Sequence, residues 1–113
     1  MNGLESVSKE RQDQLTKHKR SIEDDIKYNY QYQLVDAASV LSMPVPDDMI
    51  KIYQESYADN LPEGWDKEIW KKMVMKPYRE RLIIAAALLV AEIDRWDNIP
   101  KAAVNQTFRD AVN

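Results

Sequence analysis

Apolar residues recur every three or four positions along most of this sequence, and the polar residues between them fall on the opposite side of a helical projection. This spacing is typical of amphipathic α-helices, and no segment alternates apolar and polar residues as a half-buried strand does. The pattern predicts an all-α fold, a compact bundle of about five helices. The predicted helical segments are residues 4–19, 28–43, 46–58, 66–76 and 78–96.

The strongest hydrophobic segment lies in the last of these helices. Its middle, Leu82–Ala91, is apolar all the way round, but it is only about half as long as the roughly 20 residues of a membrane span. A helix of this kind is normally covered on every side. We therefore expect residues 82–91 to be the central helix of the bundle or to lie at a subunit interface.

Capping residues and helix breakers mark several boundaries. Ser21 can cap a turn that contains three acids, so residues 20–27 form either a loop or a short helix. The run Met43–Pro46 ends the second predicted helix, because proline restricts the residue before it and cannot continue a helix. Asp66 is suited to cap the helix that follows it.

A further apolar stripe lies near the C-terminal end of the sequence. Pro100 can open a helix over residues 100–112, which either docks on the domain or binds another chain. A length of 113 residues is typical of one domain, so we expect a single helical domain over 1–113, in which 100–112 can be a separate element. The stripe and residues 82–91 together exceed what a monomer of this size covers, which predicts a homo-oligomer. The stripe consists of Val104, Phe108 and Val112.

Composition and charge narrow the possible partners and compartment. The formal net charge is −3 and the isoelectric point about 5.2, so we expect no generic binding to nucleic acids, whose phosphates an acidic protein repels. The absence of cysteine excludes disulfides and thiolate metal ligands and is typical of a reducing compartment. Residues 1–8 lack the pattern of a signal peptide. We therefore expect a cytoplasmic protein without a membrane partner.

Polar side chains occupy positions where an ordinary amphipathic helix carries leucine. Arg11 and Gln14 lie on the inward stripe of the first predicted helix, while Glu92 and Arg95 end the otherwise apolar core helix. An unpaired polar group on such a stripe costs about 1–3 kcal/mol, so these side chains either form buried pairs that tie the bundle together or line a pocket. The candidate residues for binding a ligand or partner are Arg11, Gln14, Arg79, Glu92 and Arg95.

A basic group precedes the core helix. Lys76, Arg79 and Arg81 lie near the positive end of the helix dipole, which favours anions. They form either an anion pocket or an ordinary charged surface in which Glu80 is a partner.

The common catalytic motifs are absent from the sequence. It has only two glycines, no Gly-rich phosphate loop, and no HExxH or GxSxG motif. Its one histidine, His18, lies between two lysines and has no evident partner to orient it for catalysis. The sequence therefore favours a non-enzymatic protein without a cofactor.

The distribution of acids gives one enzymatic alternative. All-α nucleotide pyrophosphohydrolases of the MazG type hold magnesium with acids that come from two adjacent helices and lie one turn apart. This chain resembles them only in part, because Glu92 and Asp94 lie about 200° apart around a helix and cannot bind one ion together. The alternative is a divergent metal-dependent pyrophosphohydrolase, with the magnesium ligands Glu23, Asp25, Glu92 and Asp94.

Two short motifs resemble a group of small helical proteins encoded by phages and prophages. The first is ERQDQ at 10–14, and the second is KPYRERL at 76–82, which continues to AEIDR at 91–95. The resemblance implies a phage accessory gene product and carries no known activity with it. Combined with the small size and acidic charge, it predicts a non-enzymatic binding protein that acts in the host cytoplasm as an anti-defence inhibitor. Its expected partner is a host protein, such as a CRISPR-Cas nuclease complex that it blocks, or a nucleotide signal that it sequesters.

Overall fold

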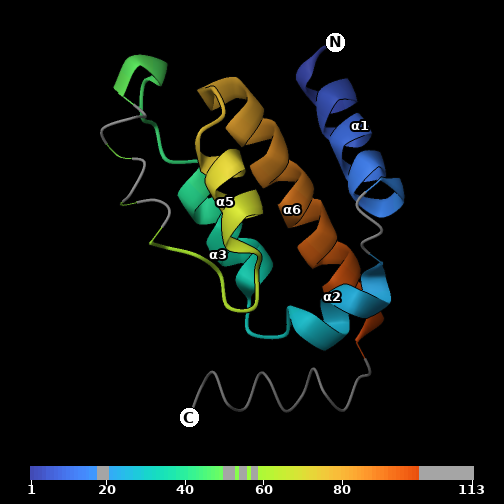
Figure 1. Cartoon of the computed structure of the whole chain (residues 1–113). Coiled ribbons are helices and arrows are strands. Elements are labelled where there is room, and N and C mark those ends of the chain that lie inside the picture. The colour runs from blue at the N-terminus through green and yellow to red at the C-terminus, as the bar shows by residue number, and fades with distance from the viewer. Residues whose placement is uncertain (18–20, 50–52, 54–55, 57–58, 100–113) are drawn as a thin grey trace, which may run out of the picture.

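A computed structural model describes residues 1–17, 21–49, 53, 56 and 59–99 of the chain. These residues form helices and no strand, which confirms the predicted all-α fold (Figure 1). The elements are α1 (Gly3–Thr16), α2 (Ile22–Tyr28), α3 (Gln33–Leu41), the 3₁₀ helix η1 (Asp47–Met49), α5 (Lys67–Val74) and α6 (Tyr78–Asn98).

The longest helix, α6, lies in the middle of the molecule. Figure 1 shows α1 on one side of α6 and the pair α3 and α5 on the other. Helix α6 contacts α1, α2 and α3, and α5 packs on α3. Each large apolar side chain buried between these helices contributes about 1.5–3 kcal/mol. The buried core consists of Leu34, Ala37, Ala38, Leu41, Trp70, Val74, Ile84, Ala85, Leu88 and Ala91.

One side of α6 remains open in the described part of the chain, although its apolar middle predicted cover on every side. Leu88 is fully buried, whereas Leu82, Leu89 and Val90 are exposed. The predicted C-terminal helix over 100–112 lies outside the described residues. Neither α6 nor any other described helix is long and apolar enough to cross a membrane.

A buried arginine connects the start of α6 with the end of α3. The Nε of Arg81 donates a hydrogen bond to the carbonyl oxygen of Lys76 at 2.9 Å. Its two Nη atoms donate to the carbonyl oxygens of Leu41, Met43 and Val45 at 3.4, 3.0 and 2.8 Å. Carbonyls at the end of a helix lack donors within the helix, and the guanidinium satisfies them here. Arg81 therefore ties two helices together and is not free to bind an anion.

Several helix boundaries follow the predicted capping signals. The Ser21 Oγ accepts a hydrogen bond from the backbone N–H of Asp24 at 3.0 Å, so the segment with three acids is a short helix. Asp66 caps α5 by accepting from the N–H of Ile69 at 2.9 Å. The predicted helix over 46–58 opens with η1, and much of its remainder lies outside the described residues.

The helix predicted over 28–43 is wrong at its start. Helix α2 ends at Tyr28, and α3 begins only at Gln33, because Tyr32 adopts a left-handed backbone with φ 66°. The Gln33 side chain stabilises this turn: its Nε2 donates to the carbonyl of Tyr28 at 3.0 Å, and its Oε1 accepts from the N–H of Gln31 at 2.8 Å. A non-glycine residue in this conformation is uncommon, and apolar periodicity does not reveal it.

Candidate functional site

The buried face of α1 is polar. Ser6, Arg11 and Gln14 are buried, whereas Leu4 is exposed and Val7 is half-buried. Arg11 and Gln14 thus point inward, as their position on the helical stripe predicted. Buried polar side chains normally have hydrogen-bond partners. Whether this face is structural or binds a ligand therefore depends on what its polar groups contact.

Two ion pairs involve the C-terminal half of α6. The Nη2 of Arg11 donates to Oδ2 of Asp94 at 3.1 Å, which bridges α1 and α6. Within α6, the Nε of Arg95 donates to Oε1 of Glu92 at 2.8 Å. The Arg95 guanidinium also lies over the ring of Tyr32, 5.7 Å from its centroid. The first pair thus joins α1 to α6, and the ring contact joins α6 to the residue that precedes α3.

Some buried polar atoms in this region have no hydrogen-bond partner among the described residues. They are Nε and Nη1 of Arg11, Oε1 of Gln14 and Oε2 of Glu92. Buried atoms of this kind usually bind ordered water or a ligand, because leaving them unpaired costs about 1–3 kcal/mol each.

Replacing Arg11 with alanine is expected to lower the melting temperature by several degrees. The change removes the contact with Asp94, and a loss of about 1 kcal/mol shifts the midpoint of a domain of this size by about 4–8 °C. Far-UV circular dichroism on heating measures it, with Gln12→Ala on the exposed side of α1 as the control. An unchanged midpoint for Arg11→Ala, together with lost ligand binding, would instead place Arg11 in a ligand site.

A second buried connection joins α2 to the segment before α5. Asn29 donates through Nδ2 to Oδ1 of Asp25 at 2.7 Å, and its Oδ1 accepts from the indole N–H of Trp65 at 2.9 Å. The Trp65 ring also packs edge-on against Trp70, with centroids 5.9 Å apart. These contacts fix the position of the Trp65 ring.

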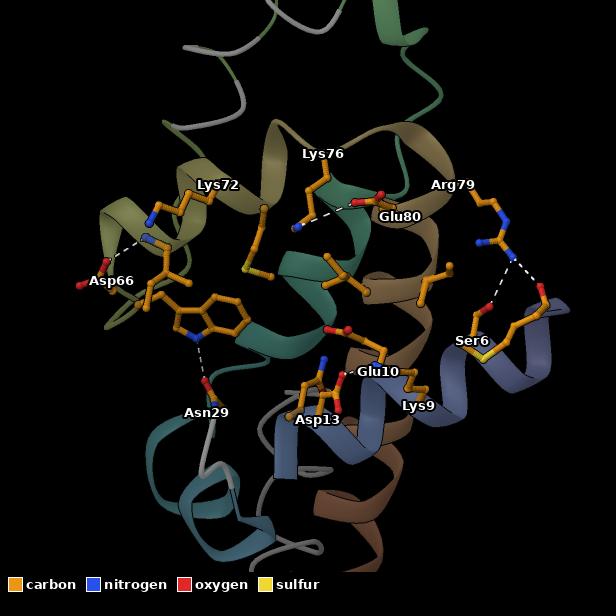
Figure 2. A pocket seen from close by; sticks show the side chains of 17 residues that line it. Ser6, Lys9, Glu10, Asp13, Asn29, Asp66, Lys72, Lys76, Arg79 and Glu80 are labelled. Carbon is orange, nitrogen blue, oxygen red and sulfur yellow. Dashed lines mark hydrogen bonds and ion pairs between the residues drawn. The ribbon is translucent and has the colours of Figure 1, made fainter. Parts of the chain in front are cut away.

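A cleft of about 930 Å³ opens between α1 and α5, with α6 behind it (Figure 2). Its volume lies in the range of about 300–1,000 Å³ that is typical of sites for small molecules. Gln14 and Asn29 are among its polar lining residues. The larger apolar side chains that line it are Trp65, Ile69, Met73, Ile83 and Ile84.

Charged side chains from α1, α5 and the start of α6 surround this cleft, and several of them are paired (Figure 2). Lys9 lies 2.9 Å from Asp13, and Lys76 lies 3.8 Å from Glu80. The hydrogen bond from Lys9 lowers the pKa of Asp13 below its ordinary value, and the same bond raises the pKa of Lys9. Both groups therefore stay charged at neutral pH, and their charges largely cancel.

Two cations of the cleft have no acidic partner among the described residues, namely Lys72 and Arg79. The Nη2 of Arg79 donates to the carbonyl of Met1 at 3.1 Å and to the Oγ of Ser6 at 3.3 Å, and both acceptors are neutral. On the α1 side, Glu10 is an acid without a basic partner in the same part of the chain. Among the described residues, the cleft thus presents two cations without an acidic partner and two carboxylates without a basic one, Glu10 and the α5 cap Asp66.

The five candidate residues predicted from the sequence fall into two places. Gln14 and Arg79 line the cleft. The other three form the ion pairs at the C-terminal half of α6 and are not part of the cleft lining: Arg11, Glu92 and Arg95.

The four acids of the magnesium alternative have separate surroundings. Glu23 is exposed on the first turn of α2, and Asp25 is buried and bonded to Asn29. Glu92 and Asp94 are held by different arginines. In the described ranges, no group of three or more histidine, cysteine, aspartate or glutamate side chains could hold a metal ion.

Helix α5 supplies cleft residues that the sequence indicates only as part of one compact apolar helix face. Trp70 and Val74 are buried in the core, whereas Ile69 and Met73 form a second apolar stripe beside them and line the cleft. Met73 also packs against the core, whereas Ile69 is exposed, so the apolar face of this short helix is wider than the part buried in the core. This width is the sequence signal that points to a second contact surface.

Comparisons with known proteins identify no relative. No protein-family model, curated protein or solved structure matches this chain.

Proposed function

We propose that this protein is a non-enzymatic binding protein that takes a small anionic ligand with a flat body, of the nucleotide class, into the cleft between α1 and α5. The observation that carries the proposal is a cleft of about 930 Å³ lined by the buried amide of Gln14, whose Oε1 has no partner among the described residues. Such a protein sequesters a nucleotide signal in the host, consistent with the accessory role that the phage resemblance implies.

The cleft offers contacts for an aromatic base. The Trp65 indole and the side chains of Met73 and Ile83 provide apolar surface for the faces of a planar ring. The Gln14 Oε1 is an acceptor that needs a donor, and an exocyclic amino group of a base supplies one. Binding of the base therefore removes the penalty of an unpaired buried acceptor.

The free charges suit the remaining parts of a nucleotide. Arg79 contacts only neutral oxygens, so its full charge is available to a phosphate, and the planar guanidinium matches phosphate geometry. Lys72 adds a second cation from α5. The Glu10 carboxylate accepts hydrogen bonds well and suits the hydroxyl groups of a ribose. Because the cleft has few cations without an acidic partner, a ligand with few phosphates fits it best.

Calorimetric titration of the full chain with linear and cyclic nucleotides tests the proposal. We expect Arg79→Ala and Lys72→Ala to weaken binding about 10- to 150-fold each, since a charge-assisted contact contributes about 1.5–3 kcal/mol. Gln14→Leu should reduce the preference for one base over the others. Lys71→Ala is the matched control, because Lys71 is the neighbour of Lys72, lies outside the cleft lining and has Glu68 at 4.0 Å.

The fate of the nucleotide separates the competing functions. Recovery of intact nucleotide supports a binding protein, whereas release of pyrophosphate in the presence of magnesium supports the pyrophosphohydrolase alternative. Absence of binding by every nucleotide, with inhibition of a host nuclease complex retained, contradicts the proposed ligand and leaves the protein-blocking role.

A further inference from the structure

A continuous apolar stripe runs along the exposed side of α6. Its four large side chains are between 38% and 59% exposed, and the alanine among them is half-buried. Successive members are four, three, four and three residues apart, which is the spacing of a coiled-coil seam. The stripe consists of Leu82, Ala86, Leu89, Ile93 and Trp96.

We infer that this stripe is a dimer interface, on which the α6 helix of a second copy of the chain packs in the antiparallel direction. An exposed apolar surface of this length marks an interaction site, and a heptad seam fits another helix with the same spacing. The stripe shares no residue with the lining of the cleft, so the inference does not depend on the ligand, although Arg79 beside the stripe belongs to both proposals.

Charges at the two ends of α6 select the second copy and its direction. Arg79 and Asp97 lie on the same flank of the stripe, because Asp97 follows Arg79 by eighteen positions, which make five full turns. An antiparallel two-fold pair brings the same flank of both helices together, so Arg79 of each copy, which otherwise donates only to neutral oxygens of Met1 and Ser6, approaches Asp97 of the other. A parallel pair places like ends side by side and loses both contacts. Antiparallel helix dipoles add to this preference.

The stripe also defines the register of the pair. Leu82 and Trp96 lie seven residues before and after Leu89. A two-fold axis that passes beside Leu89 therefore places Leu82 of one copy opposite Trp96 of the other. The bulky Ile93 then faces the region of Ala86 in the second copy, where a small side chain leaves room for it.

Cysteine cross-linking tests the direction and the register. The chain has no cysteine, so each introduced thiol is the only one present. Mild oxidation of a mixture of Leu82→Cys and Trp96→Cys chains is expected to give a mixed disulfide-linked dimer, while each variant alone stays uncross-linked. Efficient cross-linking of Leu82→Cys with itself overturns the antiparallel arrangement.

Sedimentation velocity tests whether the dimer exists. The wild-type chain is expected to sediment at twice its 13.2 kDa at micromolar concentrations. Ile93→Asp should sediment at the monomer mass with an unchanged far-UV spectrum. Leu4→Asp is the matched control, since Leu4 is an even more exposed apolar residue on α1 and lies off the stripe. The Leu4→Asp chain should still sediment as a dimer.

Charge exchange gives an independent check of the end contacts. Asp97→Arg should weaken the dimer, and adding Arg79→Asp to the same chain should restore it. A wild-type chain that is monomeric at every concentration overturns the inference. The inference is also overturned if the wild-type chain is a monomer and Ile93→Asp lowers its melting temperature. The stripe is then covered within the chain and is not a dimer interface.

Discussion

Replacing Arg81 with methionine is expected to lower the free energy of unfolding by about 3 kcal/mol or more, because it removes several hydrogen bonds from a charged group that contribute about 1.5–3 kcal/mol each; this is a large share of the roughly 5–15 kcal/mol of an ordinary domain. Methionine has a similar length and fills much of the same space, but it donates no hydrogen bond. The carbonyls at the end of α3 and before α6 then lose the donor that a side chain only 1% exposed supplies. Urea unfolding followed by circular dichroism measures the change.

The neighbouring arginine provides the control for this experiment. Arg79 lies two residues before Arg81, is exposed, and donates to only two neutral acceptors. Arg79→Met is expected to change the stability by less than about 1 kcal/mol. Equal urea midpoints for the two variants would contradict the structural role of Arg81.

A second large effect is expected at the adjacent positions Leu88 and Leu89. Leu88 is fully buried in the core, so the carboxylate of Leu88→Asp has no partner there, and the cost is on the order of the whole stability. Leu89 is 45% exposed and belongs to the apolar stripe. The Leu89→Asp chain is therefore expected to remain folded and to lose self-association only.

Far-UV circular dichroism and sedimentation velocity together separate the two variants. Leu88→Asp should lose the helical spectrum, whereas Leu89→Asp should keep it and sediment as a monomer. If Leu89→Asp unfolds as Leu88→Asp does, then α6 is covered on the side that the described residues leave open.

The sequence predicted the helices well, because apolar spacing and capping residues are local signals. Ser21 and Asp66 were predicted as caps and are caps in the structure. Which side of a helix is buried depends on its neighbours, and a helix that is apolar all the way round carries no local sign of this. Leu88 and Leu89 are equally apolar in the sequence, and only the packing of α1, α2 and α3 distinguishes them.

The candidate site was predictable for Gln14, whose type conflicts with its position, and for Arg79, which lies in the basic group at the start of the core helix. Gln14 stood out because an amide on an inward stripe needs a reason, and it lines the cleft. Lys72 and Trp65 carry no such conflict, since a lysine on a surface and a tryptophan in a core are ordinary. Their place in the cleft depends on how near α1 lies to α5, which involves residues far apart in the chain.

The structural role of Arg81 could not be predicted from the sequence either. In the sequence it is one of three basic residues before the core helix, and residue type does not separate a buried arginine from an exposed one. Its role follows from the approach of the end of α3 to the start of α6, which no spacing in the sequence encodes.

The edge-on contact between Trp65 and Trp70 gives the protein an optical signal of its own. Two indoles with centroids 5.9 Å apart, at an interplanar angle of 82°, couple their electronic transitions. One ring is packed in the core and the other lines the cleft, where Asn29 holds it. A ligand that stacks on Trp65 should therefore alter the near-ultraviolet ellipticity and quench the emission of this indole. Both can be recorded on the unlabelled chain before any ligand has been identified.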